Sequence, residues 1–343
     1  MTGPAKHPLP HPTMERRQIG RTGLSASVIG LGAAPLGGMY VPSSDAAAVE
    51  TVRAALGAGI DFIDVAPHYG QGLAEHRLGR ALAAARPERC AVSTKVGRLL
   101  VPEPRPQAQP TWPEALSYRT VYDVSRAGIL RSLDDSRARV GRADFDVLLL
   151  HDPDRQAEDE ASMARLLAES YDTLAELRAA GQVRAIGLGV NAPGVCHRAL
   201  DLGAWDCFLL AGCYSVLRQE EAGLLARCQE AGVSVLIGAP FMSGALAGGT
   251  TWRYRPIPED VAAGIARLRS IGATHGVPLE AAALQFPLLH PAVAVVVVGM
   301  RSAEEVRRNA GFLHHPIPAA FWHALLAEGF VREEHLPALG ADR

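Results

Sequence analysis

The sequence predicts a single closed barrel of eight parallel strands, each followed by a helix. From about residue 28 onward, apolar runs of strand length alternate with amphipathic segments of helix length. The runs are apolar on both faces, as expected for parallel strands covered by helices. The rival fold, an open doubly wound sheet, normally carries G-x-G-x-x-G after its first strand. Here that segment reads GLGAAPLGG, which does not fit, so we favour the (β/α)8 (TIM) barrel.

Eight strands and ten helices are expected. The strands are VIGLG from residue 28, DFIDV from 61, AVSTK from 91, FDVLLLH from 145, VRAIGLGV from 183, DCFLLAG from 206, VSVLI from 233 and VAVVVVG from 293. The helices span 45–58, 73–85, 122–139, 160–180, 193–202, 219–231, 258–275, 279–289, 302–312 and 318–330. Ser44 or Asp45 is the expected N-cap of the first helix.

Two segments fall outside the repeat. RRQIGRTGLSASV, before the first strand, is typical of a β-hairpin turning at Arg21–Gly23, which would cap the bottom of the barrel. Residues 97–121 are rich in proline and too long for a routine connection, so we expect a long loop over the active site. The expected domain limits are a disordered tail at 1–14, the barrel at 15–330 and a loose tail at 331–343.

Composition excludes several classes of partner. The 34 basic and 36 acidic residues form no block or stripe, which argues against nucleic-acid and membrane-surface partners. Five cysteines without a C-x-x-C spacing argue against disulfides and a thiolate zinc site. Prolines in the first 14 residues argue against a signal peptide, and no apolar run reaches the roughly 18 residues of a membrane helix. We therefore expect a cytoplasmic protein, monomeric or a small homo-oligomer.

Titratable side chains follow three consecutive strands at the end where barrels of this kind carry their chemistry. Asp64 ends the second strand and Tyr69 follows it, while Lys95 and His151 end the third and fourth. One polar residue at a strand end commonly marks only the water boundary. Four on consecutive strands indicate a catalytic group.

The residue types suggest the roles. A tyrosine has a pKa near 10, and a nearby lysine cation lowers it by favouring the tyrosinate. A buried Lys95 needs a counter-charge, which Asp64 can supply, and neutral His151 can hydrogen-bond the reacting oxygen. No metal is required.

The same residues carry a resemblance. FIDVAPHYGQGLAEHRLGRAL resembles the aldo-keto reductase signature of Asp, Tyr and G-x-x-E-x-x-x-G, here Gly72, Glu75 and Gly79. STK with Lys95 and LLLHDPD with His151 match the other two positions of the family's tetrad. The resemblance implies a nicotinamide cofactor (NAD, NADP or both) bound without a Rossmann fold, and no metal.

The resemblance also implies cofactor contacts, with departures. Asn191 matches the asparagine that holds the nicotinamide amide, but the usual serine before it is Val190 and the usual glutamine is Ala211. The usual stacking tyrosine is replaced by Gly238 or Ala239, and we expect Phe241 to cover part of that surface.

SGAL (243–246) matches the family's pyrophosphate loop, and GMRSAEEVRRN (299–309) matches the adenosine segment. Arg301 would favour a 2′-phosphate and Glu305 would disfavour one, so dual or NAD-leaning use is expected. The expected cofactor residues are Asn191, Gly238, Phe241, Ser243, Gly244, Leu246, Gly299, Arg301, Ser302, Glu305 and Asn309.

Within the family, GLGAAPLGGMY, KVGRLL and AGCYSVL are similar to a branch that oxidises aldoses or pyridoxal. We expect oxidation of a sugar hemiacetal at C1, with Tyr40, His68, Arg98 and Trp112 in the substrate loops. Three alternatives stay open: reduction of a small aldehyde or ketone or oxidation of pyridoxal by the same tetrad, a non-catalytic NADP-binding subunit, and a metal-dependent hydrolase using His151 and Asp152.

Overall fold

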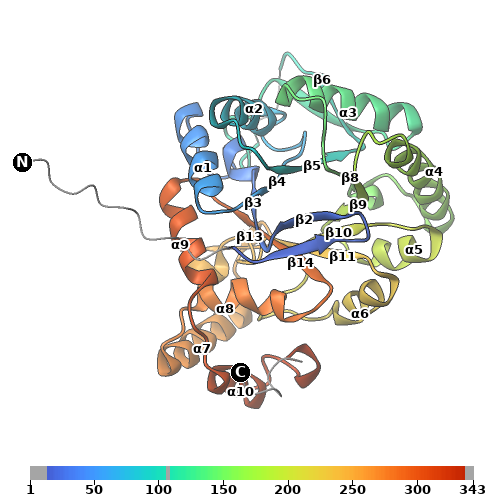
Figure 1. Cartoon of the computed structure of the whole chain (residues 1–343). Coiled ribbons are helices and arrows are strands. Elements are labelled where there is room, and N and C mark those ends of the chain that lie inside the picture. Colours follow the sequence, from blue (N-terminus) through green and yellow to red (C-terminus); the bar gives the residue numbers. More distant parts are fainter. Residues whose placement is uncertain (1–13, 106–108, 337–343) are drawn as a thin grey trace, which may run out of the picture.

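A computed structural model describes residues 14–105 and 109–336, and it contains the expected closed barrel (Figure 1). All eight expected strands are present and pair in parallel in chain order around the barrel. They are β3 (Ile29–Gly32), β4 (Phe62–Asp64), β5 (Ala91–Val96), β8 (Val147–His151), β9 (Ala185–Val190), β10 (Cys207–Ala211), β11 (Ser234–Gly238) and β14 (Val293–Gly299).

The helices surround the strands, as Figure 1 shows. They are α1 (Asp45–Gly57), α2 (Leu73–Ala85), α3 (Arg126–Val140), α4 (Glu160–Ala179), α5 (Gly194–Leu202), α6 (Ala222–Ala231), α7 (Glu259–His275), α8 (Leu279–Gln285), α9 (Ala303–Leu313) and α10 (Ala319–Ala327). Ser44 is the N-cap of α1, since its side chain accepts a hydrogen bond from Ala47 N.

The expected N-terminal hairpin is confirmed and closes one end of the barrel. Its strands are β1 (Arg16–Ile19) and β2 (Leu24–Ser27), paired antiparallel around residues 20–23. Ile19 and Leu24 belong to the apolar cluster that fills the barrel interior together with Phe62. Burial of these side chains drives the closure, and the opposite end of the barrel is left for the site.

Residues 97–121 were expected to form one long loop, and this was wrong in part. Strands β6 (Arg98–Pro102) and β7 (Tyr118–Tyr122) pair antiparallel beside the barrel, so α3 begins later than expected, at Arg126. Proline is tolerated because Pro102 is the last residue of a two-stranded ribbon, where a missing N–H is harmless. A second unexpected ribbon joins β12 (Thr251–Trp252) to β13 (Arg255–Pro256).

The C-terminal boundary differs from the expectation of a loose tail beginning at residue 331. Val331, His335 and Leu336 are buried, and Glu333–His335 forms a short 3-10 helix. Burial of Val331 and Leu336 supplies the contact that holds this stretch on the barrel. The remaining tail predictions, for residues 1–13 and 337–343, lie outside the described residues.

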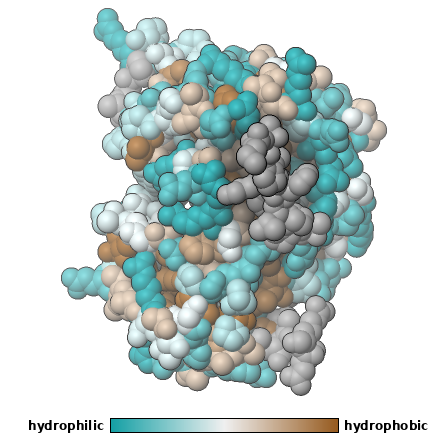
Figure 2. Space-filling view, turned by 60° about the vertical axis from the view of Figure 1, so that its left-hand side comes forward, coloured by the Kyte–Doolittle hydropathy of each residue, from teal (hydrophilic) through white to brown (hydrophobic). Residues whose placement is uncertain are grey.

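The surface is mixed in character. Figure 2 shows one face on which hydrophilic residues are interspersed with hydrophobic ones. Among the helices that the structure describes, none combines the length and the hydrophobicity that a bilayer crossing requires.

Candidate active site

Four side chains meet at the open end of the barrel, where β4, β5 and β8 end. Lys95 Nζ lies 2.6 Å from Asp64 Oδ2 and donates a hydrogen bond to the Tyr69 hydroxyl oxygen at 3.0 Å. Lys95 and Asp64 are each 2% exposed. The structure therefore brings together the residues that the sequence had placed at consecutive strand ends.

Tight turns hold Tyr69 over Lys95. Gly70 has φ +63°, and a Cβ there would overlap the Gly37 carbonyl oxygen. Only glycine permits both this backbone conformation and the close approach of the two loops. The Tyr69 ring in turn stacks on Trp112, with 5.8 Å between centroids and an angle of 25° between planes.

Burial decides the protonation of the phenol. It raises the pKa of Tyr69, the Lys95 ammonium lowers it, and the Asp64 carboxylate raises it again, with a net rise. Burial disfavours the Lys95 cation, but Asp64 and Tyr69 outweigh this and raise the pKa of Lys95. At neutral pH the phenol therefore carries its proton, because burial and Asp64 together outweigh the effect of Lys95 on the pKa of Tyr69.

His151 completes the group in its neutral form. Burial holds the pKa of His151 well below its usual value, and the charges of Arg98 and Lys95 lower it further. Its ring lies edge-on to Tyr69 at 6.5 Å between centroids. Its Nδ1 is buried and has no hydrogen-bond partner within the described part of the chain. The residue lines the cavity, so its neutral ring is placed to hydrogen-bond a ligand oxygen.

Asp152, which the hydrolase alternative pairs with His151 at a metal, links three parts of the site. Its carboxylate pairs with Arg98 and accepts a hydrogen bond from the Asn191 backbone N–H at 3.0 Å. Both carboxylate oxygens are thus engaged by protein groups, which leaves Asp152 poorly suited to bind a metal with His151. No cluster of three potential metal-ligating side chains occurs among residues 14–105 and 109–336.

A cavity of about 820 Å³ extends from the tetrad toward α9. The four residues expected in the substrate loops, Tyr40, His68, Arg98 and Trp112, all line it. Burial and the Arg98 charge lower the pKa of His68 to about 4, so His68 is neutral. At this end, the cavity combines neutral donors and acceptors, a guanidinium and aromatic rings.

The other end of the cavity holds most of the residues expected to bind a cofactor. Asn191, Gly238, Phe241, Ser243, Gly244, Gly299, Arg301, Glu305 and Asn309 all line it. Leu246 does not, because its side chain packs into the core. Ser302 is absent from the lining as well, since its hydroxyl caps α9 by accepting from Glu305 N.

The lining residues that the sequence analysis did not assign include Tyr122, Tyr254 and Arg308. A signal existed for Arg308, because it lies three residues after Glu305 and therefore on the same face of α9. Tyr122 and Tyr254 reach the cavity from the two unexpected ribbons, and no local pattern reveals such contacts.

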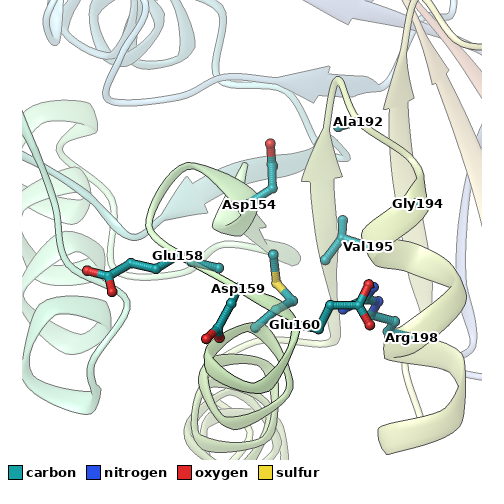
Figure 3. Close-up of a pocket in the computed structure, with 10 residues that line it drawn as sticks. Asp154, Glu158, Asp159, Glu160, Ala192, Gly194, Val195 and Arg198 are labelled. Carbon is teal, nitrogen blue, oxygen red and sulfur yellow. The ribbon is translucent and has the colours of Figure 1, made fainter.

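A second cavity, of about 390 Å³, lies beside the start of α4 and α5 (Figure 3). Two of its four acidic side chains have structural partners. Asp159 caps α4 by accepting from Ser162 N, and Glu160 pairs with Arg198. We therefore place the chemistry in the larger cavity.

Comparison with known proteins identifies the family. The sequence profile of the Aldo/keto reductase family matches residues 28–327, and the chain belongs to that family. It is accordingly an NAD(P)-dependent oxidoreductase.

Several relatives extend over nearly the whole chain. A pyridoxal 4-dehydrogenase of Microbacterium luteolum is 40% identical over 92% of this chain and 98% of its own length. A D-threo-aldose 1-dehydrogenase of a Pseudomonas species is 37% identical, covering 89% of this chain and 94% of its own. The solved aldo-keto reductase AKR11C1 from Bacillus halodurans superimposes with a TM-score of 0.72 at 25% identity, over 94% of this chain and 99% of that one.

The residues present fit the nicotinamide dinucleotide that the family implies. The cavity has the size of a cofactor pocket. Gly238 and Ala211 lie in its wall, where they place no large side chain. Asn191 would hold the nicotinamide amide, and residues near the start of α9 would hold the adenosine end, where a helix N-terminus suits phosphate.

The buried pair predicts a specific stability pattern. Asp64→Asn leaves the Lys95 ammonium buried without a counter-charge, so we expect the free energy of unfolding to fall by about 3–5 kcal/mol. Adding Lys95→Met to Asp64→Asn should recover most of that loss but no turnover. Chemical denaturation of the two single variants and the double variant measures this. A double variant no more stable than Asp64→Asn would contradict the assigned pairing.

Proposed function

We propose that this enzyme oxidises an aldose, in its cyclic hemiacetal form, at C1 to the lactone. The observation that carries the proposal is the Tyr69 hydroxyl held 3.0 Å from Lys95 Nζ, in a cavity that also exposes His151. When bound, the nicotinamide dinucleotide supplies the acceptor for the hydride that leaves C1. The chain's own residues must then bind the sugar, orient C1 and remove one proton.

Tyr69 is the group that takes the C1 hydroxyl proton, acting as tyrosinate. Lys95 favours that form, while Asp64 keeps Lys95 charged. His151, neutral and in the cavity wall beside Tyr69, donates a hydrogen bond to the same oxygen and so fixes C1 over the cofactor end of the cavity. Loss of one hydride and one proton converts the hemiacetal carbon to the lactone carbonyl.

The remaining hydroxyls would be bound by the substrate loops. Arg98 offers a guanidinium, since its side chain lines the cavity. Trp112 and His68 lie edge to face at 5.8 Å between centroids, and both border the space beside Tyr69. An indole face and polar edges of this kind suit a sugar ring. Tyr40, 36% exposed at the mouth, would contact the far end of the substrate.

Pyridoxal is the second candidate substrate. Like an aldose, it carries a hydroxyl that can close on its aldehyde to a cyclic hemiacetal, so the same tetrad serves it. The aromatic lining around Tyr69, formed by Trp112 and Tyr122, suits a planar ring, and a pyridoxal 4-dehydrogenase is 40% identical. Reduction of a small aldehyde or ketone is the same step in reverse. The intact tetrad disfavours a purely regulatory role.

We infer that the enzyme uses both cofactors with a preference for NAD. Glu305 lies 3.1 Å from Arg301 and also accepts its backbone N–H, so the guanidinium that would bind a 2′-phosphate is already paired. The free thiol state of all five cysteines supports a reducing, cytoplasmic location. We expect a monomer or small homo-oligomer.

A substrate panel tests the proposal. We expect L- and D-aldoses to be oxidised with NAD at higher kcat/KM than pyridoxal or simple aldehydes. Tyr69→Phe, which keeps the ring but loses the proton acceptor, should lower kcat by about 100-fold or more while the dissociation constant for NAD stays within twofold. Pyridoxal as the best substrate would shift the assignment to the second candidate, and undiminished turnover in Tyr69→Phe would overturn the mechanism.

The raised pKa of Tyr69 predicts that kcat depends on pH differently for oxidation and for reduction. Oxidation needs the tyrosinate, whose fraction rises tenfold per pH unit below the pKa, so kcat for oxidation should climb between about pH 7 and 9. Reduction uses the protonated phenol and should stay flat there. Lys95→Met removes the cation that favours tyrosinate, which displaces the oxidation limb to higher pH. Full pH–rate profiles in both directions check this, and an oxidation limb centred near the ordinary pKa of histidine would contradict it.

The cofactor preference should respond to Glu305. Glu305→Gln removes the charge that pairs with Arg301 and repels a 2′-phosphate, so the dissociation constant for NADP should fall about tenfold relative to that for NAD. Titration calorimetry with both cofactors measures the ratio. Glu304→Gln is the matched control, because Glu304 lies in the same helical turn outside the cavity lining. Equal effects of the two substitutions would rule out the local pairing.

A further inference from the structure

The tip of the β12–β13 ribbon has an unusual backbone. Its two turn residues, Arg253 and Tyr254, have φ +47° and +67°. Turns of this kind favour asparagine and glycine, because other side chains are strained in the left-handed region. Strain of this kind, when observed, points to a functional role for the side chains it positions.

Tyr254 reaches from that tip across the cavity mouth. Its backbone N–H donates to Ser243 Oγ at 3.3 Å, and its hydroxyl donates to Asn191 Oδ1 at 3.4 Å. The side chain lines the cavity while the residue is 51% exposed, so its ring is not part of the core. Trp252, directly before the turn, packs against the core and anchors the ribbon.

The barrel wall near Asn191 lacks a large side chain. The ends of β10 and β11 carry Ala211 and Gly238, both in the cavity lining. Phe241, which we expected to cover the nicotinamide, packs partly against the core. Tyr254 is the aromatic residue whose hydroxyl contacts the amide that is expected to hold the nicotinamide.

We propose that Tyr254 is a cofactor-positioning residue that occupies Asn191 in the free protein and supplies the aromatic surface against the nicotinamide ring in the bound one. The inference rests on the proposed nicotinamide site at Asn191. In the free protein, the Tyr254 hydroxyl donates a hydrogen bond to Asn191 Oδ1. The carboxamide N–H of an incoming nicotinamide would donate to the same oxygen. Binding therefore exchanges one partner of Asn191 for another, while the ring of Tyr254 remains at the mouth.

Two substitutions separate the hydroxyl from the ring. Tyr254→Phe removes the competing hydroxyl, so the dissociation constant for NAD should stay equal or fall by up to about threefold. Tyr254→Ala removes the ring as well, and the dissociation constant for NAD should rise about 3- to 10-fold, the range that one aromatic contact provides. Titration calorimetry measures both constants without turnover.

ADP-ribose, which lacks the nicotinamide, separates a local contact from general loosening of the ribbon. Its dissociation constant should be unchanged in Tyr254→Ala. Arg253→Ala is the matched control, since Arg253 shares the strained turn but does not line the cavity, and it should bind NAD like the parent protein.

Three results would overturn the inference. They are parental NAD binding by Tyr254→Ala, an equal loss for NAD and ADP-ribose, and an equal loss of NAD binding in Arg253→Ala. Failure of the parent protein to bind NAD or NADP would instead refute the proposed function itself.

Discussion

The contact between Lys95 and Asp64 is the constraint on which the site depends. Two opposite charges, each 2% exposed, are tolerated at the end of the barrel only because they compensate each other. Neighbouring parallel strands make this possible, since Asp64 at the end of β4 pairs with Ser93 in β5, two residues before Lys95. The ammonium also donates to the Val65 carbonyl oxygen at 3.2 Å, which leaves its third donor for the Tyr69 hydroxyl. The acidity of the phenol therefore depends on groups that the barrel strands position.

Burial and charge act against each other on that phenol. The low-polarity surroundings that strengthen the Lys95 interaction also disfavour the tyrosinate. The resting protein is thus set up with the proton on Tyr69, ready to act as an acid. The same surroundings keep His151 neutral, so the reacting oxygen meets a donor without a competing positive charge.

The sequence was sufficient for the barrel and the tetrad because both follow from local pattern. Apolar runs locate the strands, and residues that follow those runs necessarily meet at one end of a parallel barrel. The two small ribbons were not predicted, because their pairing depends on contacts far from any periodic segment, as with Arg98 opposite Tyr122. The role of Asp152 was not predicted for a similar reason, because its partners come from distant segments: Arg98 lies on β6 and Asn191 follows β9. The stripe of cavity residues on α9 was readable from helical spacing.

Asp152 joins the two halves of the cavity through one carboxylate. It pairs with Arg98 on the substrate side and accepts a hydrogen bond from Asn191 on the cofactor side. The backbone of Asp152 has φ +42° in the segment that follows β8. A ligand that draws Arg98 away from this carboxylate therefore alters the free energy with which Asn191 engages its own ligand. Thermodynamic linkage makes that influence mutual, so each half of the pocket senses occupancy of the other without any movement of the barrel.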